Sequence, residues 1–340
     1  MVTLKDIASR VGVSINTVSH ALKGKPDIGA ETVRRIKAAA AELGYRPNPA
    51  ARSLVLKKSY TIGAAMTEID NPVRVEFCEK LRVLAARDGY RLLTAALSDN
   101  NWRANIGGLL DHHVDGLIVG AVWDVPGASG SADGMEECRN ARIPVVSFGK
   151  NRLLPGDSVE IDLENSVYRL TWHLLERKYS GIALFAGPKS IANFRGYERA
   201  MAEAGLKTKT RRLDLSFGRM ETAYHDLTRF LDSGGELPEA IIAANDLSAL
   251  GAIRALHEHG IAVPEQCAVA GVDNIGFARY AVPSLTSIGF DNGLCAETVW
   301  NLMIRRLKNQ EKRAVVRKAI RQKLFIREST DPLNRRSLTL

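Results

Sequence analysis

The segment from residue 14 to residue 23 carries side chains whose types and spacing could bind a nucleic acid. Val18, Ala21 and Leu22 recur at helical spacing and would turn inward. The N-terminal half of the same helix then presents an outward face made of Ile15, Asn16, Thr17, Ser19 and His20. Asparagine can bond adenine through two hydrogen bonds, histidine can donate to guanine or to a phosphate, and isoleucine can contact a thymine methyl. This face is therefore a candidate for reading base edges.

Three short helices would have to hold that face in place. Thr3 can cap a first helix that ends at Gly12, Ser14 can cap the second helix, and a third helix ends at Gly44. A glycine-marked tight turn between the first two helices is typical of a helix-turn-helix module, whose second helix enters the major groove. The alternative interpretation is a small helical subdomain with an ordinary polar surface.

The distribution of charge favours the nucleic-acid interpretation. The 340 residues include 47 Lys and Arg against 38 Asp and Glu, which gives a net charge of +9. Residues 1–60 hold eleven basic and four acidic residues (+7), and residues 305–340 hold twelve and three (+9), so residues 61–304 carry −7. Such an asymmetry is typical of a protein with a polyanionic partner, with nucleic acid first and an anionic membrane surface second.

Composition and the N-terminal residues exclude several other classes of protein. An apolar fraction of 45% is ample for a buried core, so the chain is not uniformly disordered. The first twenty residues lack the apolar stretch of a secretory signal, and no apolar run reaches the roughly eighteen residues that cross a bilayer. The four cysteines are far apart, which is typical of reduced thiols. We therefore expect a cytoplasmic protein without a membrane partner.

No combination of residues predicts catalysis, a metal site or a cofactor. His112 and His113 have no third ligand at metal spacing, and the adjacent Glu136 and Glu137 would point apart on a helix. The sequence contains neither a phosphate-binding P-loop nor the Gly-x-Ser-x-Gly motif of a nucleophilic serine. We therefore expect a protein that is not an enzyme and that carries no cofactor.

The first sixty residues also carry a family resemblance. The string VTLKDIASRVGVSINTVSHALKG, followed by ETVRRIKAAAAELGYRPNPAARSL, resembles the DNA-binding headpiece of the LacI/GalR family of bacterial transcription regulators. The resemblance implies that Ile15, Asn16 and His20 read bases. It also implies that Thr3 lies near the DNA backbone. Four residues of the turn and second helix would lie at phosphates: Ser14, Thr17, Ser19 and Lys23. The headpiece would span residues 1–47.

Residues 48–58 would form the hinge helix and linker of such a regulator. Asn48 suits a helix cap, Pro49 suits a first helical turn, and Ala51 and Leu54 would lie on a narrow apolar edge. This segment is too short for a stable isolated helix, because helix nucleation is costly. By resemblance, it folds on the operator and inserts Leu54 as a wedge into the minor groove. The alternative is an ordinary exposed leucine in a linker.

Beyond residue 60 the pattern changes to short apolar runs that alternate with amphipathic helices. Strands are expected at residues 61–66, 91–97, 116–122, 143–148, 181–187, 239–243 and 267–272. Helices are expected at residues 73–88, 102–113, 164–178, 193–204, 219–233, 246–259 and 294–308. Regular alternation of this kind favours two doubly wound, parallel-sheet α/β subdomains, with a ligand cleft beyond the carboxyl ends of the strands.

The family resemblance continues through this body and covers about residues 2–330. The strings IDNP, VDGLIVG, IPVV, AANDLSALGAIRAL and VPEQCAVAGVDN are similar to the periplasmic-binding-protein-like core of the same regulators. The resemblance implies an effector-binding and dimerisation core at residues 59–330. Its two interleaved subdomains would be residues 59–160 with 289–318, and residues 161–288 with 319–330, followed by a flexible tail at residues 331–340.

The resemblance also implies which residues face the effector. Asp273 matches a carboxylate that bonds ligand hydroxyls in many members, although it could instead cap a helix. Asp246 follows a strand and could likewise be the cap of the next helix. Phe217 and Phe290 fall where aromatics or amides often flank the ligand, and Asn193 replaces a frequent effector-binding arginine.

Other positions depart from the family pattern and suggest a particular effector. Val73 and Arg74 replace an aromatic pair, and Gly149 and Lys150 replace an acidic residue and its neighbour. Our hypothesis is a sugar derivative with a negative charge, such as a sugar acid or a sugar phosphate, held partly by Arg74 and Lys150. The alternative is that both cationic side chains extend into solvent.

The C-terminal basic stretch fits an edge strand at residues 319–328 better than a second DNA contact. No leucine heptads follow Ser329, so a tetramer-forming coiled coil is not expected. The sequence therefore predicts a dimeric repressor that binds a palindromic operator and responds to a small carbohydrate-like effector. The alternatives are a regulator controlled by a partner protein, one that needs no effector, and a sugar-processing enzyme with a fused DNA-binding head.

Overall fold

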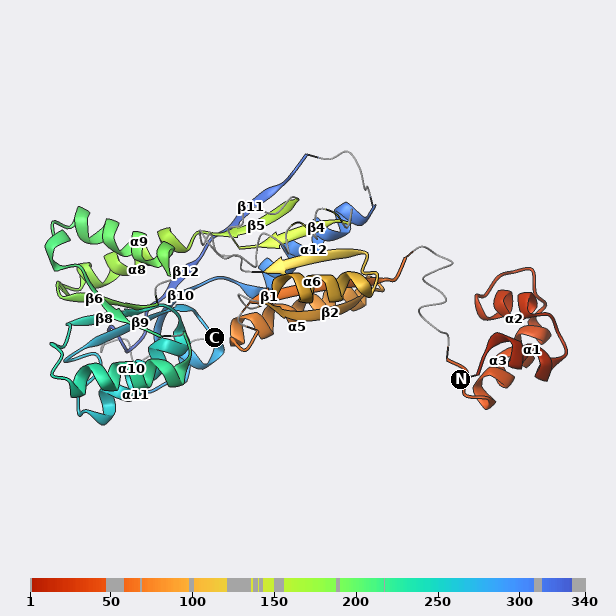
Figure 1. Cartoon of the computed structure of the whole chain (residues 1–340), viewed down its shortest axis with the longest axis horizontal. Helices are drawn as coiled ribbons and strands as arrows, with labels where there is room; N and C mark the ends of the chain where they lie inside the picture. Colours follow the sequence, from red (N-terminus) through yellow and green to blue (C-terminus); the bar gives the residue numbers. More distant parts are fainter. Residues whose placement is uncertain are drawn as a thin grey trace. The chain divides into compact units, whose positions relative to one another are not determined.

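The chain divides into two units, residues 1–59 and 60–340, which Figure 1 shows in the colours of the sequence. The computed structural model describes residues 2–46, 58–67, 69–97, 101–120, 136, 140, 143–149, 156–187, 190–216, 218–308 and 314–331. Of residues 191–193 it describes the backbone only. No helix in these ranges is long and apolar enough to cross a membrane.

The first unit is a bundle of three helices, α1 (Leu4–Val11), α2 (Ile15–Leu22) and α3 (Ala30–Glu42). Helix α1 ends at Gly12, whose φ of 75° lies in the left-handed region that glycine adopts without strain. One small core joins the three helices, and it includes the fully buried Ile7, Val18 and Ile36. The helix-turn-helix module predicted from the sequence is confirmed.

The second unit contains two six-stranded sheets. The first has the order β11-β5-β4-β3-β1-β2 and is parallel throughout. Its strands are β1 (Thr61–Thr67), β2 (Arg91–Leu97), β3 (Gly116–Gly120), β4 (Val145–Phe148), β5 (Asp157–Ile161) and β11 (Arg317–Ile320). Helices α5 (Pro72–Arg87) and α12 (Asn292–Lys308) pack together into the core on one face, and α6 (Trp102–Asp111) packs into the core on the other.

The second sheet has the order β12-β10-β9-β8-β6-β7 and is parallel except for its edge strand β12. Its strands are β6 (Ile182–Ala186), β7 (Arg211–Asp214), β8 (Ala240–Ala243), β9 (Ala268–Asp273), β10 (Thr286–Gly289) and β12 (Lys323–Phe325). Helices α8 (Leu163–Glu176) and α9 (Ile191–Glu203) cover one face, and α10 (Met220–Asp232) and α11 (Asp246–Glu258) cover the other. Two short 3-10 turns, η1 (Lys207–Lys209) and η2 (Gly276–Arg279), complete this sheet's subdomain.

All fourteen elements expected beyond residue 60 are present, with ends that differ by up to two residues where the structure describes them. The predicted fold class, a helical headpiece with two doubly wound α/β subdomains, is confirmed. Strands β5, β7 and β10 were not predicted. These strands are only four or five residues long, and each carries polar residues, so their sequences lack the apolar run that marks a buried strand.

The prediction of one edge strand at residues 319–328 was wrong. The chain forms two strands there, and they belong to different sheets: β11 pairs with β5, whereas β12 pairs with β10. Gln322 lies between them and is buried. The chain therefore passes between the two subdomains at this point, as it does between β5 and α8 and between β10 and α12.

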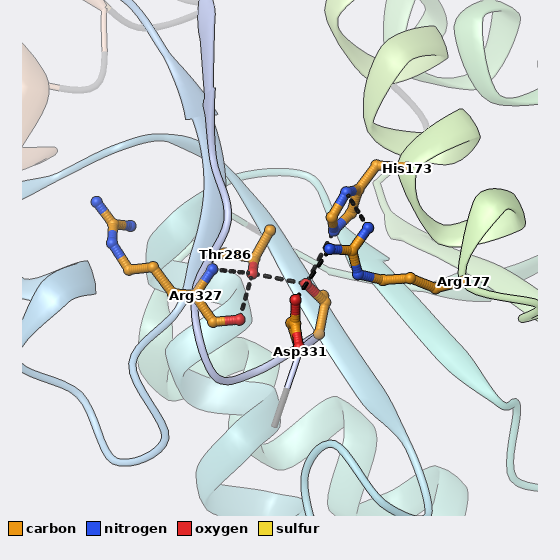
Figure 2. A network of polar contacts seen from close by, with 6 residues as sticks. His173, Arg177, Thr286, Arg327 and Asp331 are labelled. Carbon is orange, nitrogen blue, oxygen red and sulfur yellow. Dashed lines mark hydrogen bonds and ion pairs between the residues drawn. The ribbon is translucent and has the colours of Figure 1, made fainter. Parts of the chain in front are cut away.

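A polar network fixes the last described residues to α8 and β10 (Figure 2). Arg177 donates to His173 Nδ1 at 3.0 Å, so the histidine proton lies on Nε2, which donates to Thr330 Oγ1 at 3.0 Å. Thr330 Oγ1 is in turn 2.7 Å from Thr286 Oγ1. Burial lowers the pKa of His173 to about 4, so this histidine is neutral near pH 7.

Arg327 connects the same network to the loop that follows β9. Its backbone N–H donates to Thr286 Oγ1 at 2.8 Å, and its guanidinium donates to Asn274 Oδ1 at 2.7 Å and to the Leu285 carbonyl at 2.5 Å. Asn274 follows Asp273, the last residue of β9. The C-terminal segment therefore helps to position the strand end at which the sequence predicts a ligand contact.

Candidate nucleic-acid interface and effector cleft

The N-terminal half of α2 presents the residues that the sequence predicts for base contacts. Ser14 caps the helix, because its Oγ accepts a hydrogen bond from the Thr17 N–H at 3.0 Å and lies 2.8 Å from Thr17 Oγ1. Ile15 is 49% exposed, and Asn16 is also exposed. Val18 lies on the opposite face and is fully buried, so the packing of α2 directs Ile15 and Asn16 outward.

His20 lies one turn further along α2 and is more enclosed than the sequence suggested. Its side chain is 23% exposed, and its Nδ1 lies 2.5 Å from Asp27 Oδ2. The hydrogen bond from His20 holds the pKa of the Asp27 carboxyl below its usual value. A role for Asp27 was not predicted from the sequence, because Asp27 follows the turn at Gly24 and Pro26 and belongs to no helical pattern.

The remaining predicted headpiece contacts lie at the ends of helices or outside the described residues. Thr3 and Asp6 form a capping box at the start of α1, in which the Thr3 N–H donates to Asp6 Oδ2 at 2.8 Å. Lys23 follows the end of α2 and is exposed, and Ser19 is half-buried. Three predicted hinge residues lie outside the described ranges: Asn48, Ala51 and Leu54.

In the second unit, side chains at the ends of strands meet across the two subdomains. Asp273 ends β9 in the second sheet, and its Oδ2 accepts a hydrogen bond from Asn71 Nδ2 at 3.1 Å. Asn71 caps α5, which packs on the first sheet. Asp70 forms an ion pair with Arg219 at 2.9 Å, which also joins the two subdomains. Asp273 has a φ of 112°, a strained conformation of the kind that is common at functional sites.

Arg74 is buried near the same junction. Only 8% of it is exposed, so the alternative in which its side chain extends into solvent is wrong. Its guanidinium lies 5.2 Å from the ring centroid of Phe148, the last residue of β4, and Phe148 makes an edge-to-face contact with Phe290 at 5.8 Å. Its Nε is buried without a hydrogen-bond partner in the described part of the chain. Burying a cation in this way is costly unless an anion or other acceptor reaches it.

Two other predicted effector contacts, Val73 and Asp246, are buried at the junction. Val73 is 2% exposed and belongs to the core cluster of the second sheet, so it provides an apolar contact between the subdomains. Asp246 is fully buried, and its two oxygens accept from the Ile275 N–H at 2.8 Å and from Ser287 Oγ at 2.6 Å. Both residues are therefore occupied in packing or in positioning the loop after β9.

Asp246 is not the cap of α11 either. The cap is Asn245, whose side chain accepts from the Ser248 N–H at 2.8 Å. Burial, followed by the nearby Asp273 carboxyl, raises the pKa of Asp246 well above its ordinary value. Gly271 permits this arrangement, since a Cβ there would collide with Asp246 Oδ1.

Three other predicted effector contacts have no described side chain. Lys150 and Phe217 lie outside the described residues, and Asn193 belongs to α9, whose first three side chains are not described. Phe290 is half-buried and packs against the core clusters of both subdomains. Of the predicted set, Arg74, Asp273 and Phe290 are therefore the residues whose positions at the subdomain junction support a ligand contact.

A cavity of about 390 Å³ lies elsewhere, between α8 and the segment formed by the end of β12 and Ile326, and Leu324 and Ile326 are among its lining residues. Two arginines of this cavity already have protein partners: Arg169 donates to the Gln322 carbonyl at 2.9 Å, and Arg177 pairs with Asp331 at 3.0 Å. This cavity is separate from the junction at Arg74 and Asp273, and the sequence did not predict it.

The described cysteines and acidic residues suggest neither redox chemistry nor a metal site. Cys78, Cys267 and Cys295 are free thiols, and burial raises the pKa of Cys267 to about 12, which makes its thiolate inaccessible near neutral pH. Across the ranges that the structure describes, no group of three His, Cys, Asp or Glu residues could hold a metal ion.

A chain that combines a helix-turn-helix unit with a core of two parallel sheets is typical of one class of protein, the DNA-binding regulators of transcription. Residues 3–48 match the lacI family of bacterial regulatory proteins, and residues 171–330 match the periplasmic binding protein-like domain. The chain is 31% identical over 319 residues to the HTH-type transcriptional repressor PurR of Erwinia tasmaniensis, covering 91% of this chain and 92% of that protein. The chain belongs to the LacI family.

Two solved structures extend the comparison to the whole chain. The lac repressor dimer bound to operator and the anti-inducer ONPF has a TM-score of 0.80 and 25% identity, covering 97% of this chain and 99% of that one. The complex of the transcriptional regulator CelR with cellobiose has a TM-score of 0.66 and 26% identity, covering 97% and 100%. The predictions of a DNA-binding transcriptional repressor that is not an enzyme, and of a periplasmic-binding-protein-like core, are confirmed.

Proposed function

We propose that this repressor binds a palindromic operator as a homodimer and that a small carbohydrate-like effector in the cleft between its subdomains controls the affinity. The outward face of α2 would enter the major groove, with Ile15, Asn16 and His20 at base edges. The operator-bound lac repressor dimer, which covers nearly the whole chain, supports this binding mode. Thr3, Ser14, Thr17, Ser19 and Lys23 would contact the DNA backbone.

Exposed apolar side chains on both subdomains support a dimer. Val75 and Val83 on α5 are more than half exposed, and Phe277, Tyr280 and Val282 beside η2 are between 61% and 92% exposed. Clusters of exposed apolar side chains are typical of surfaces that bind another protein. A second copy of this chain would cover both sets, and the two headpieces would then reach two half-sites.

The buried Arg74 supports an effector with a negative charge. Its Nε lacks a partner in the described residues, and it lies beside Phe148 and close to the junction that Asp273 and Asn71 form. An acid or phosphate group could bond Arg74, while Asp273 would accept hydrogen bonds from hydroxyl groups. Lys150, Phe217, Asn193 and Phe290 would complete the cleft. The CelR complex with cellobiose supports the carbohydrate part of the proposal.

The effector would act by binding one arrangement of the subdomains more tightly than another. That shift would reach the operator through residues 48–58, where Asn48 and Ala51 would support Leu54 as a wedge at the central base step. The Leu54→Ala variant should therefore lose operator affinity while it keeps the thermal stability of the core. Equal operator affinities for this variant and the wild type would contradict the wedge.

Selection from random duplexes with the full chain tests operator binding. We expect enrichment of a palindrome, and we expect its affinity to change when the best effector is added. A selected site without two-fold symmetry would contradict binding as a homodimer, and enrichment of no sequence would contradict operator binding altogether.

A thermal-shift screen of neutral sugars, sugar acids and sugar phosphates tests the effector. We expect the acids or phosphates to stabilise the wild type and not Arg74→Met, because methionine can fill the buried space without binding an anion. Arg254→Met is the matched control, since Arg254 is exposed on α11 and pairs with Glu258 at 2.5 Å. Stabilisation by neutral sugars alone would contradict the negative charge.

A further inference from the structure

The contact between His20 and Asp27 determines which nitrogen of the histidine ring can meet DNA. A carboxylate can only accept hydrogen bonds, and Asp27 Oδ2 lies 2.5 Å from His20 Nδ1. Nδ1 must therefore carry a proton whether the ring is neutral or positively charged. No residue in the described part of the headpiece bonds the other ring nitrogen, Nε2.

The two protonation states of His20 consequently differ at Nε2 alone. In the neutral ring, Nε2 has a lone pair and accepts a hydrogen bond, whereas in the charged ring Nε2 carries a proton and donates one. In the major groove, guanine presents two acceptors, N7 and O6, while cytosine presents an amine donor and adenine an amine beside N7. Each state of the ring thus matches a different base.

We propose that Asp27 makes base recognition by His20 depend on protonation, so that the neutral ring selects an amine of cytosine or adenine and the charged ring selects guanine. This inference rests on the proposed function, because His20 must lie against base edges for its Nε2 to be read out. Asp27 is then a positioning residue, which fixes the tautomer and orientation of the ring without contacting DNA itself.

Asp27 is the charged residue that bonds the His20 ring in the described headpiece. Helices α1 and α3 pack against α2 through the headpiece core. On these helices, Arg10 pairs with Glu42, Arg34 pairs with Glu31, and Arg35 donates to the Val11 carbonyl. Lys5 on α1, Lys37 on α3 and Lys23 after α2 are exposed. Asp6 is bonded to Thr3. The hydrogen bond from His20, with a smaller contribution from Lys25, lowers the pKa of the Asp27 carboxyl.

The test is selection of palindromes with randomised half-sites by the full chain, at about pH 6 and about pH 8.5. We expect one half-site position to change from guanine at the lower pH to cytosine or adenine at the higher pH. Anisotropy titrations of the two selected duplexes should show a preference of roughly fivefold to tenfold that reverses between these conditions.

Asp27→Asn is the decisive variant. Its amide can rotate to donate to Nδ1, so that a neutral ring can carry its proton on Nε2 and donate to guanine. We expect this variant to select guanine at both pH values. His20→Gln, which does not titrate, should select the same base at both pH values.

Glu31→Gln is the matched control, because this substitution also removes one negative charge from the headpiece. The native Glu31 pairs with Arg34 and does not contact His20. It should behave like the wild type. The inference would be overturned if the wild type selected the same base at both pH values. It would also be overturned if Asp27→Asn showed the same pH-dependent selection as the wild type. Failure of the wild type to enrich any palindrome would instead contradict the proposed operator binding.

Discussion

The headpiece and the core hold their candidate functional side chains in opposite ways. In the headpiece, Ile15 and Asn16 project from one short helix into solvent, and the Ser14 cap and the His20–Asp27 contact of the same unit join residues three and seven positions apart. In the core, Asn71 and Asp273 meet across 202 residues. The outward face of α2 is supported within one small unit, whereas the junction between the two sheets brings together segments distant in the sequence.

The two regions also differ in how they use charge. The described basic residues of the headpiece are exposed, whereas those of the C-terminal segment are divided between the surface and the core. Arg306 forms a two-point ion pair with the fully buried Asp157, with Nε at 3.0 Å, and Arg327 is buried among backbone and amide acceptors. Part of the net positive charge is therefore paired inside the core, while Lys308, Arg317, Lys318, Arg321 and Lys323 remain exposed.

The variant with the largest expected effect tests whether the headpiece and the core unfold independently. Ile36→Ala removes a fully buried side chain from the small headpiece core and should cost about 2–5 kcal/mol of the unit's free energy of unfolding. Because a unit of this size has little stability to lose, we expect operator affinity to fall at least about tenfold. Fluorescence anisotropy with the selected palindrome measures this, and circular dichroism melting follows the core.

Ile15→Ala provides the control for the stability part of that experiment, because Ile15 is exposed. Ile15→Ala should leave the free energy of unfolding nearly unchanged, since a half-exposed side chain packs little. A parallel fall in the melting temperature of the core in Ile36→Ala would contradict the independence of the two units.

A pH-dependent loss of stability should be confined to the core. The pKa of His173 is about 4 in the folded protein against an ordinary value of 6.5, so its contribution is fully present above about pH 6.5 and is lost as the pH falls toward 4. We expect a loss of about 3 kcal/mol in the free energy of unfolding over this range. Urea unfolding at several pH values measures it.

His173→Gln isolates that contribution, because the other titrating groups remain. The variant should show a pH dependence between 7 and 4 that is weaker than that of the wild type by the same amount. An identical pH dependence in both proteins would mean that His173 is not buried as a neutral group.

A smaller effect is expected from a single residue on the outward face of α2. Asn16→Ala should cost about 1–3 kcal/mol of operator binding and should relax the preference at one half-site position, if Asn16 bonds a base. Competition between the selected operator and random DNA distinguishes the possibilities. Equal losses on both DNAs would make Asn16 a backbone contact.

The smallest expected effect concerns the charge of the headpiece. Lys23→Ala should weaken binding to all sequences by a similar amount. It should also reduce the slope of log affinity against log salt by roughly one, because one fewer phosphate is neutralised. Titrations at several salt concentrations measure this slope. A slope equal to that of the wild type would remove Lys23 from the DNA interface.

Much of the fold could be read from the sequence because its signals are local. Helix caps at Ser14 and glycine at position 12 define the turn, and alternating apolar runs define most strands of the core. Short strands with polar residues, such as β7 and β10, were missed because pairing with neighbouring strands, and not their own composition, makes them strands.

The candidate sites were less predictable, because burial and distant partners decide what a polar residue does. Asp246 and Asp273 both follow strands and look alike in sequence, yet Asp246 is enclosed by Ser287 and Ile275. Arg74 could have extended into solvent, and it is buried beside Phe148 instead. The spacing of residues does not reveal which carboxylate or cation the surrounding segments will cover.

The sequence by itself determined the three-helix headpiece, the outward face of α2 and the two-subdomain α/β class, since helix periodicity, caps and apolar runs act over short distances. Only the tertiary structure decided that Asp27 holds His20, that Asn71 joins Asp273, and that the last strands divide between the two sheets. Those contacts depend on where the chain returns in space, and the free energy of burying polar groups selects among the alternatives that local sequence leaves open.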